Sequence, residues 1–304
     1  MRSFFITLLN FCLVALFRRL LIAITMANFT LIFFLSTNVA SAESISVKQF
    51  IAKASFQNGY VFQFYKNRNY KLFWLGNTED NSARLNAFTF ALTDAPMHGL
   101  PSSKFSSKSL LSEISNVNSN EELGYLDVKL TLVFVKYAGV MANGILKPKK
   151  IDKKIERANS FNENFDFLSE LQQSDPFGFF KNLFPPSPEY KRLMKEKYRL
   201  EKLLASGGWG SLLTANKLSV GEQGGDVVLL RNRLILMGYL SSTHSSFYDQ
   251  PLVKAVKDFQ SDNGISSDGS ANQSTLNLIN VSVEERLKSV LVAMERERWS
   301  RTPH

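Results

Sequence analysis

The sequence predicts a mainly α-helical protein, on three observations. Within residues 45–145, apolar residues recur three or four positions apart, which is the spacing of one helix face. Prolines precede a predicted helix at Glu189–Leu204, which ends at Ser206-Gly207-Gly208 as a glycine C-cap would end it. Between residues 221 and 281, three short helical segments are separated by glycine-marked turns.

The first 42 residues are predicted to be a secretory signal peptide. They contain three arginines, no acidic residue and two apolar runs, and they end in Ala40-Ser41-Ala42, the small-x-small pattern that signal peptidase accepts. The alternative is a retained membrane anchor. Leu20–Leu35 is short for a span, which needs about 20 apolar residues. We therefore expect export and cleavage before Glu43.

Two helices are predicted in the first half of the mature chain. Their apolar repeats are Phe88, Leu92 and Ala95 in one, and Leu126, Leu130, Val133 and Phe134 in the other. Pro96 should stop the first helix, and Gly144 the second. Residues 147–165 are basic, lack an apolar period and are interpreted as a linker or exposed loop.

Three short helices and a longer one are predicted in the last third. Asp226 is a candidate cap for the first, which Gly238 would close. Asp249 is a candidate cap for the second, with Pro251 in its first turn. The third spans Ser274–Ile279, and an amphipathic helix then runs from Val283 to Trp299.

The charge pattern argues against nucleic acid as a partner. The net charge of +9 is spread along the chain, with its densest basic run at Lys147–Arg157. A nucleic-acid-binding surface would instead cluster basic residues on one face.

The mature chain should also lack the common catalytic groups. Its one cysteine, Cys12, lies in the predicted signal, which leaves no disulfide and no thiol nucleophile. His98, His244 and His304 are far apart and lack metal-ligand spacing. We therefore expect no catalytic residue, no metal and no cofactor.

The segment from 216 to 281 contains the run Ala255-Val256-Lys257-Asp258-Phe259-Gln260, followed by Gly264 and Asp268-Gly269. With this run as its most specific match, the segment resembles the three-helix peptidoglycan-binding module of many cell-wall enzymes. Asn272 departs from the pattern, which usually has glycine there. Because asparagine tolerates a left-handed backbone, we expect the turn to survive.

The flanking segments carry further motifs: Phe64-Tyr65, Phe73-Trp74 and His98-Gly99-Leu100 before this segment, and Glu284–Trp299 after it. The first three resemble the scaffold domain of large periplasmic L,D-transpeptidases, and the last resembles the linker helix before their catalytic domain. The resemblance implies a signal peptide (1–42), a helical scaffold domain (43–208), a peptidoglycan-binding-like domain (216–281) and a linker helix (282–304). It also implies a periplasmic location.

The family's catalytic Ser-His-Gly-Cys motif does not occur in these residues. The first hypothesis is therefore a non-catalytic peptidoglycan-binding scaffold protein in cell-wall biogenesis, with a cell-wall enzyme as a further expected partner. The second is a truncated or split L,D-transpeptidase whose catalytic half is missing. The third is a partner-binding scaffold that uses the apolar face of Val283–Met294. The oligomeric state is not predicted.

Four side chains near turns of the module are candidate peptidoglycan contacts: Tyr239, Tyr248, Gln260 and Asp268. The alternative is that Tyr248 and Gln260 fasten the turns through hydrogen bonds to the backbone. Aromatic residues are a separate candidate sugar platform, although their clustered spacing is also that of a core: Trp74, Phe177, Phe179 and Phe180.

Overall fold

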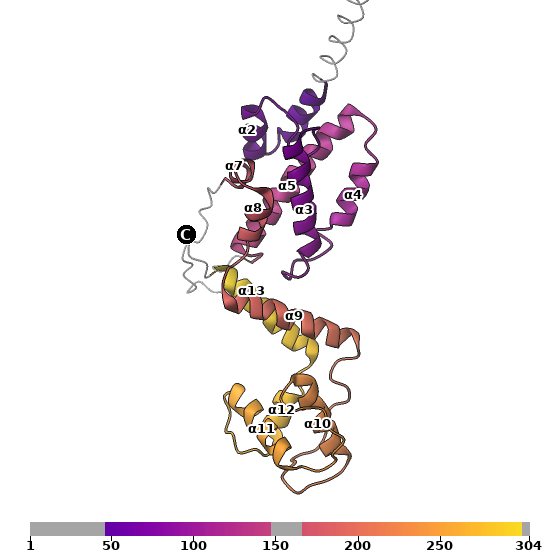
Figure 1. Ribbon diagram of the computed structural model, residues 1–304, viewed down its shortest axis with the longest axis vertical. Helices are drawn as coiled ribbons and strands as arrows, with labels where there is room; N and C mark the ends of the chain where they lie inside the picture. Colours follow the sequence, from indigo (N-terminus) through magenta and orange to yellow (C-terminus); the bar gives the residue numbers. More distant parts are fainter. Residues whose placement is uncertain (1–45, 147–165, 300–304) are drawn as a thin grey trace, which may run out of the picture. The chain divides into compact units, whose positions relative to one another are not determined.

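The computed structural model describes residues 46–146 and 166–299, where helices form all the regular structure apart from two isolated β-bridges (Figure 1). The predicted fold class is therefore confirmed. The predicted signal (1–42) and linker (147–165) lie outside the described residues. No helix within the described ranges is long and apolar enough to cross a membrane.

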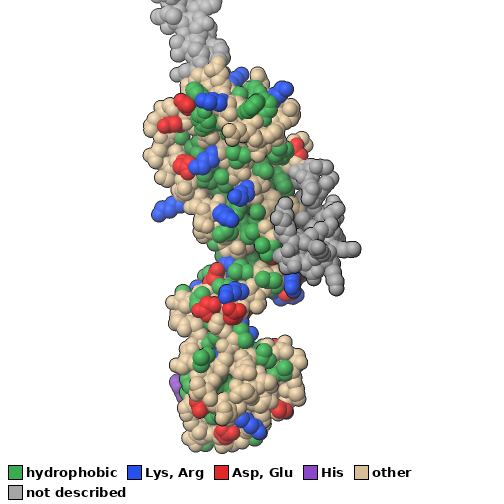
Figure 2. Space-filling view, turned by 180° about the vertical axis from the view of Figure 1, so that it is seen from behind, with side chains coloured by type: hydrophobic (Ala, Val, Ile, Leu, Met, Phe, Trp, Pro, Cys, Tyr) green, Lys and Arg blue, Asp and Glu red, His purple; other side chains and the backbone are tan. Residues whose placement is uncertain are grey.

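The described residues form two compact units. The first comprises residues 46–93, 105–138 and 166–180, and the second comprises residues 94–104, 139–146 and 181–299. Parts of the segment 43–208 therefore contribute to both units. On the face shown in Figure 2, basic and acidic side chains are interspersed rather than gathered by sign.

The first unit is a helical assembly. Residues 46–55 are helical, and the labelled helices that follow are α2 (Gly59–Asn67), α3 (Glu79–Asp94), α4 (Ser107–Ser115), α5 (Asn120–Asn143), α7 (Phe167–Gln173) and α8 (Pro176–Asn182). The first apolar repeat is buried, and α3 ends before Pro96 as predicted. The second repeat lies on α5, where Val133 is only half-buried.

Aromatic rings fill the core of this unit. Phe88 lies 5.1 Å from Trp74, 5.7 Å from Phe134 and 5.7 Å from Phe180, measured between ring centroids. Phe179 is buried beside Phe180. Of the proposed sugar platform, these three residues (Trp74, Phe179 and Phe180) are therefore core. Phe177 is exposed.

A buried carboxylate, Asp127 of α5, organises the turn before α3. Its Oδ1 accepts hydrogen bonds from the Tyr65 hydroxyl (2.6 Å) and the Phe73 backbone N–H (2.9 Å). Its Oδ2 accepts the backbone N–H groups of Trp74 and Leu75, both at 2.9 Å. Because buried backbone donors need partners, this side chain replaces the hydrogen bonds that the turn cannot make internally.

In the second unit, α9 (Pro188–Ala205) and α13 (Val283–Trp299) lie side by side (Figure 1). Ser187 caps α9, and Gly207 and Gly208 follow its end with positive φ, so the predicted C-terminal signal is confirmed. Part of the apolar face of α13 is covered: Val283 is buried with Leu200 and Trp209, and Leu287 packs on them. Val292 is 47% exposed, and the partner-binding alternative stays a prediction.

A buried polar network lies at the C-terminal end of α13. Arg298 forms an ion pair with Glu295 (2.9 Å) and donates hydrogen bonds to the Tyr190 hydroxyl (2.9 Å) and the His98 carbonyl. The Tyr190 hydroxyl also lies 3.1 Å from His98 Nδ1, in a hydrogen bond whose donor is set by the tautomer of the imidazole. Burial, followed by the charges of Arg298 and Lys197, lowers the pKa of His98 to about 4.

This pKa predicts an acid-sensitive unit. Between about pH 6.5 and 4, His98 is protonated in the unfolded state but not in the folded state. The free energy of unfolding therefore falls as the pH falls. The expected contribution is about 3 kcal/mol in total, or roughly 1.4 kcal/mol per pH unit. Urea titrations at several pH values measure it. His98→Gln should give a shallower slope than the wild type, and exposed His244→Gln is the matched control. Equal slopes for His98→Gln and wild type would contradict the prediction.

Three short helices complete the second unit: α10 (Gly225–Met237), α11 (Gln250–Asp262) and α12 (Gln273–Ile279). Their shared core includes Leu230, Leu234, Val256, Phe259 and Leu276, all fully buried. We refer to these helices and their loops, residues 221–281, as the module.

The helix ends of the module agree with the sequence except at Asp226. Gly238 closes α10 in a left-handed conformation, and Asp249 caps α11, both as predicted. Asp226 is not a cap: Gly224 holds that position, with a φ of 136° that favours glycine, and Asp226 lies in the first turn. Asn272 is accommodated with an extended backbone rather than a left-handed one, and its side chain caps α12 by accepting from the Thr275 N–H.

Candidate functional site

Two loops of the module pair by backbone hydrogen bonds. The Tyr248 N–H donates to the Glu222 carbonyl (2.8 Å), and Tyr248 accepts from Gly221 (3.0 Å). The Gly224 N–H donates to Ser246, and an isolated bridge joins Gln223 to Phe247. The start of α10 and the segment before α11 therefore form one continuous surface.

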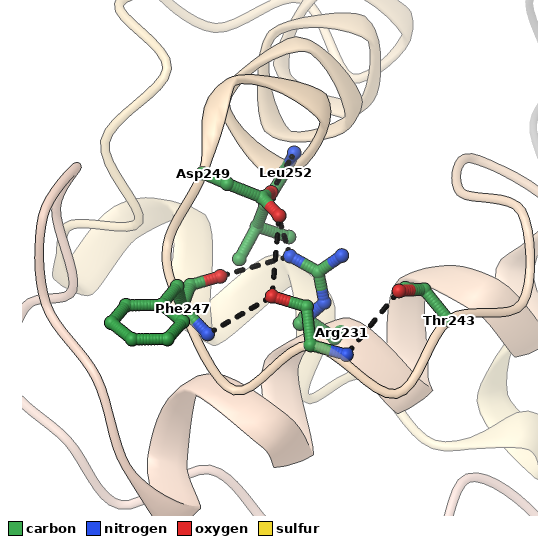
Figure 3. A network of polar contacts seen from close by, with 6 residues as sticks. Arg231, Thr243, Phe247, Asp249 and Leu252 are labelled. Carbon is green, nitrogen blue, oxygen red and sulfur yellow. Dashed lines mark hydrogen bonds and ion pairs between the residues drawn. The ribbon is translucent and has the colours of Figure 1, made fainter.

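The buried side chain of Arg231 stabilises this surface. Its side chain is 3% exposed, and Nη1 contacts Asp249 Oδ1 at 2.7 Å and the Phe247 carbonyl oxygen at 2.9 Å (Figure 3). Asp249 also accepts the Leu252 N–H at the start of α11. Burial acts to raise the pKa of Asp249, but the hydrogen bonds from Arg231 and Leu252 outweigh it and lower that pKa. A single ion pair thus joins α10, the loop and α11.

A second polar cluster holds the turn before α12. The fully buried Gln260 accepts the Gly269 N–H (2.9 Å), and its Nε2 lies within 3.0 Å of Asp268 Oδ1 and the Ser270 carbonyl. Tyr248, 1% exposed, donates to the Gly269 carbonyl (2.9 Å). A Cβ at Gly269 would lie 2.8 Å from Val253 Cγ1, and φ is +80°, so the turn requires glycine.

Tyr239 belongs to a different contact. Its hydroxyl donates to Asp262 (3.0 Å), and its ring packs edge-on against Phe259. Partial burial and the Asp262 carboxylate raise its pKa to about 12. The phenol therefore stays protonated near neutral pH.

The structure thus brings together three of the four predicted site residues: Tyr248, Gln260 and Asp268. The first two are buried and bonded to the backbone of the turn, as the alternative interpretation describes. Asp268 is exposed, and hydrogen bonds from Ser270 and Gln260 lower its pKa. Their part in peptidoglycan binding stays a prediction.

Sequence reasoning missed two residues of this region, Arg231 and Phe247. Arg231 lies four positions after Val227 on the buried face of α10, and a charge on an apolar face is a signal for a buried ion pair. Phe247 precedes the buried Tyr248 in extended backbone, so alternation places its ring on the outside. Its side chain is 51% exposed.

Among the described residues, no group of three or more His, Cys, Asp or Glu side chains could hold a metal ion. The polar side chains described above stabilise loops, and the surface they hold is exposed.

The fold and this surface define a helical binding module joined to a helical scaffold. Residues 60–196 match the family model described as Scaffold domain, and residues 223–279 match the one described as Putative peptidoglycan binding domain. The chain therefore carries a scaffold domain and a peptidoglycan-binding domain, and it resembles the N-terminal part of L,D-transpeptidases, as the sequence indicated. A search of curated proteins found no match.

Proposed function

We propose that this chain is a non-catalytic periplasmic scaffold protein of the L,D-transpeptidase family that binds peptidoglycan during cell-wall biogenesis. One observation carries the proposal: residues 223–279 match a peptidoglycan-binding domain, and the matched segment folds into a module whose loops are held by buried polar groups. Loops that are already ordered lose little conformational entropy on binding, which favours recognition of a ligand.

Binding, rather than chemistry, is the role we assign to these residues. The family's acyl transfer needs an activated nucleophile beside a base. The 304 residues contain no Ser-His-Gly-Cys motif, and their one cysteine, Cys12, lies in the predicted signal. The exposed loops offer a shallow surface with many weak contacts, for which we expect a Kd of about 1 µM to 1 mM.

Sedimentation with purified sacculi tests this function. The purified chain is expected to pellet with sacculi and to stay soluble without them, in parallel with a known wall-binding protein. Sacculi are anionic and the chain has a net charge of +9. The assay is therefore repeated at about 0.5 M salt, where the Debye length is only a few ångströms and non-specific attraction is screened. A chain that stays in the supernatant while the reference protein pellets would refute the proposal.

A further inference from the structure

Phe247 is an apolar ring presented to solvent from a fixed backbone. Its N–H donates to the Ser245 hydroxyl (3.2 Å), and its carbonyl oxygen accepts from Arg231 (2.9 Å). The bridge to Gln223 restrains it from the other loop. Figure 3 shows the ring turned away from Arg231 and Asp249, while its carbonyl faces the guanidinium. The backbone of Phe247 is therefore held in place, while its ring is not used in the core.

The polar side chains of segment 220–226, which pairs with the backbone of Phe247, are neutral or acidic. The Gln223 side-chain amide and the Ser246 hydroxyl lie on the two paired loops, 3.3 Å apart. The charged residues of segment 220–226 are Glu222 and Asp226, both exposed. The buried guanidinium of Arg231 is already paired with Asp249.

From this surface we infer that the module binds the glycan strand of peptidoglycan rather than its stem peptide, with Phe247 stacking on a sugar ring. The inference rests on the proposed function. One face of an N-acetylhexosamine is a row of C–H groups that packs on an aromatic ring and excludes water. Its hydroxyl and acetamido groups can exchange hydrogen bonds with Gln223 and Ser246.

The exposed acidic residues of this segment favour the glycan strand over the stem peptide as the ligand. Stem peptides carry free carboxylates, and placing them beside Glu222 and Asp226 costs free energy through like-charge repulsion. A neutral sugar ring meets no such cost. The loop surface therefore fits a ligand that is a neutral ring with one apolar face and polar groups at its edge.

Binding of the full chain to two fractions of the same sacculi tests the inference. One fraction is the glycan strands freed of peptide by an amidase, with the lactyl carboxylates that this cleavage exposes converted to amides so that the strands stay neutral, and the other is the released stem peptides. We expect the wild type to bind the stripped glycan strands and the peptides to compete weakly. Phe247→Ala should weaken glycan binding by about tenfold or more, while Phe247→Trp, which keeps an aromatic face, should bind as the wild type does.

Leu212→Ala is the matched control, since Leu212 is a 64% exposed apolar residue of the same unit. It should leave binding unchanged. If the wild type binds whole sacculi and Phe247→Ala binds equally well, the inference fails and the proposed function stands. If stem peptides compete for binding and stripped glycan does not, the inference also fails while the proposed function stands. If the wild type does not bind sacculi at all, the proposed function itself fails.

Discussion

Asp127→Ala is expected to lower the free energy of unfolding of the first unit by about 5 kcal/mol, because it removes the acceptor of three backbone N–H groups at once. Each buried donor left unpaired costs roughly 1–3 kcal/mol. Asp127→Asn should cost less, about 2–3 kcal/mol, because its amide oxygen can keep Trp74 and Leu75 while the Phe73 N–H faces an amide nitrogen.

Urea titration followed by circular dichroism measures this graded effect. Amide hydrogen exchange adds a local readout, since protection should fall first at Phe73, Trp74 and Leu75. Asp80→Ala, at an exposed position in the first turn of α3, is the control and should cost about 0.5 kcal/mol. If both Asp127 variants stay within about 1 kcal/mol of the wild type, the role assigned to this carboxylate is wrong.

The elements that sequence reasoning predicted well are those fixed by local chemistry. The period of Phe88, Leu92 and Ala95, the Asp249 cap and the Gly238 stop depend on neighbours within about one helical turn. Two details differ: Gly224 rather than Asp226 takes the cap position of α10, and Asn272 is extended rather than left-handed. Both depend on the path of the incoming loop, which the local pattern does not contain.

The burial of the charged groups could not be predicted from the local sequence, because their partners are distant in the chain. Asp127 meets a turn more than 50 residues away, and Arg298 meets the His98 carbonyl 200 residues away. A charged residue in a helical pattern is normally placed on the solvated face. Only its partner, supplied by the tertiary fold, makes burial favourable. The module could be predicted because its most specific residues, Gln260, Gly264 and Asp268-Gly269, are close together in the sequence. Their spacing is set by a single turn.

Phe247 illustrates why the candidate site could be predicted only in part. The turn-fastening residues carry a recognisable spacing, whereas a surface ring is distinguished by exposure and by a backbone fixed from another helix. Arg231 supplies that fixation from α10, 16 residues earlier in the chain. In this module, the residues that hold the loops and the ring that we propose as a ligand contact are thus different sets.

Arg298→Met is expected to destabilise the second unit by about 3–5 kcal/mol, because it leaves the Glu295 carboxylate buried without its counter-ion. The side chains of Arg298 and Glu295 are only 3% and 6% exposed, so water cannot replace the lost partner. Exposed Arg192, paired with Glu189, is the matched control. Arg192→Met should cost less than about 1 kcal/mol, since a surface pair contributes little.

A second substitution separates charge burial from packing. Glu295→Gln in the Arg298→Met background removes the unpaired charge and keeps an acceptor for the Leu146 N–H, 2.7 Å away. The double variant should therefore recover about 1–2 kcal/mol relative to Arg298→Met. Urea titrations of the wild type, Arg298→Met, Glu295→Gln and the double variant at pH 7 give this coupling directly. A double variant no more stable than Arg298→Met would mean that lost packing, and not an uncompensated charge, accounts for the effect.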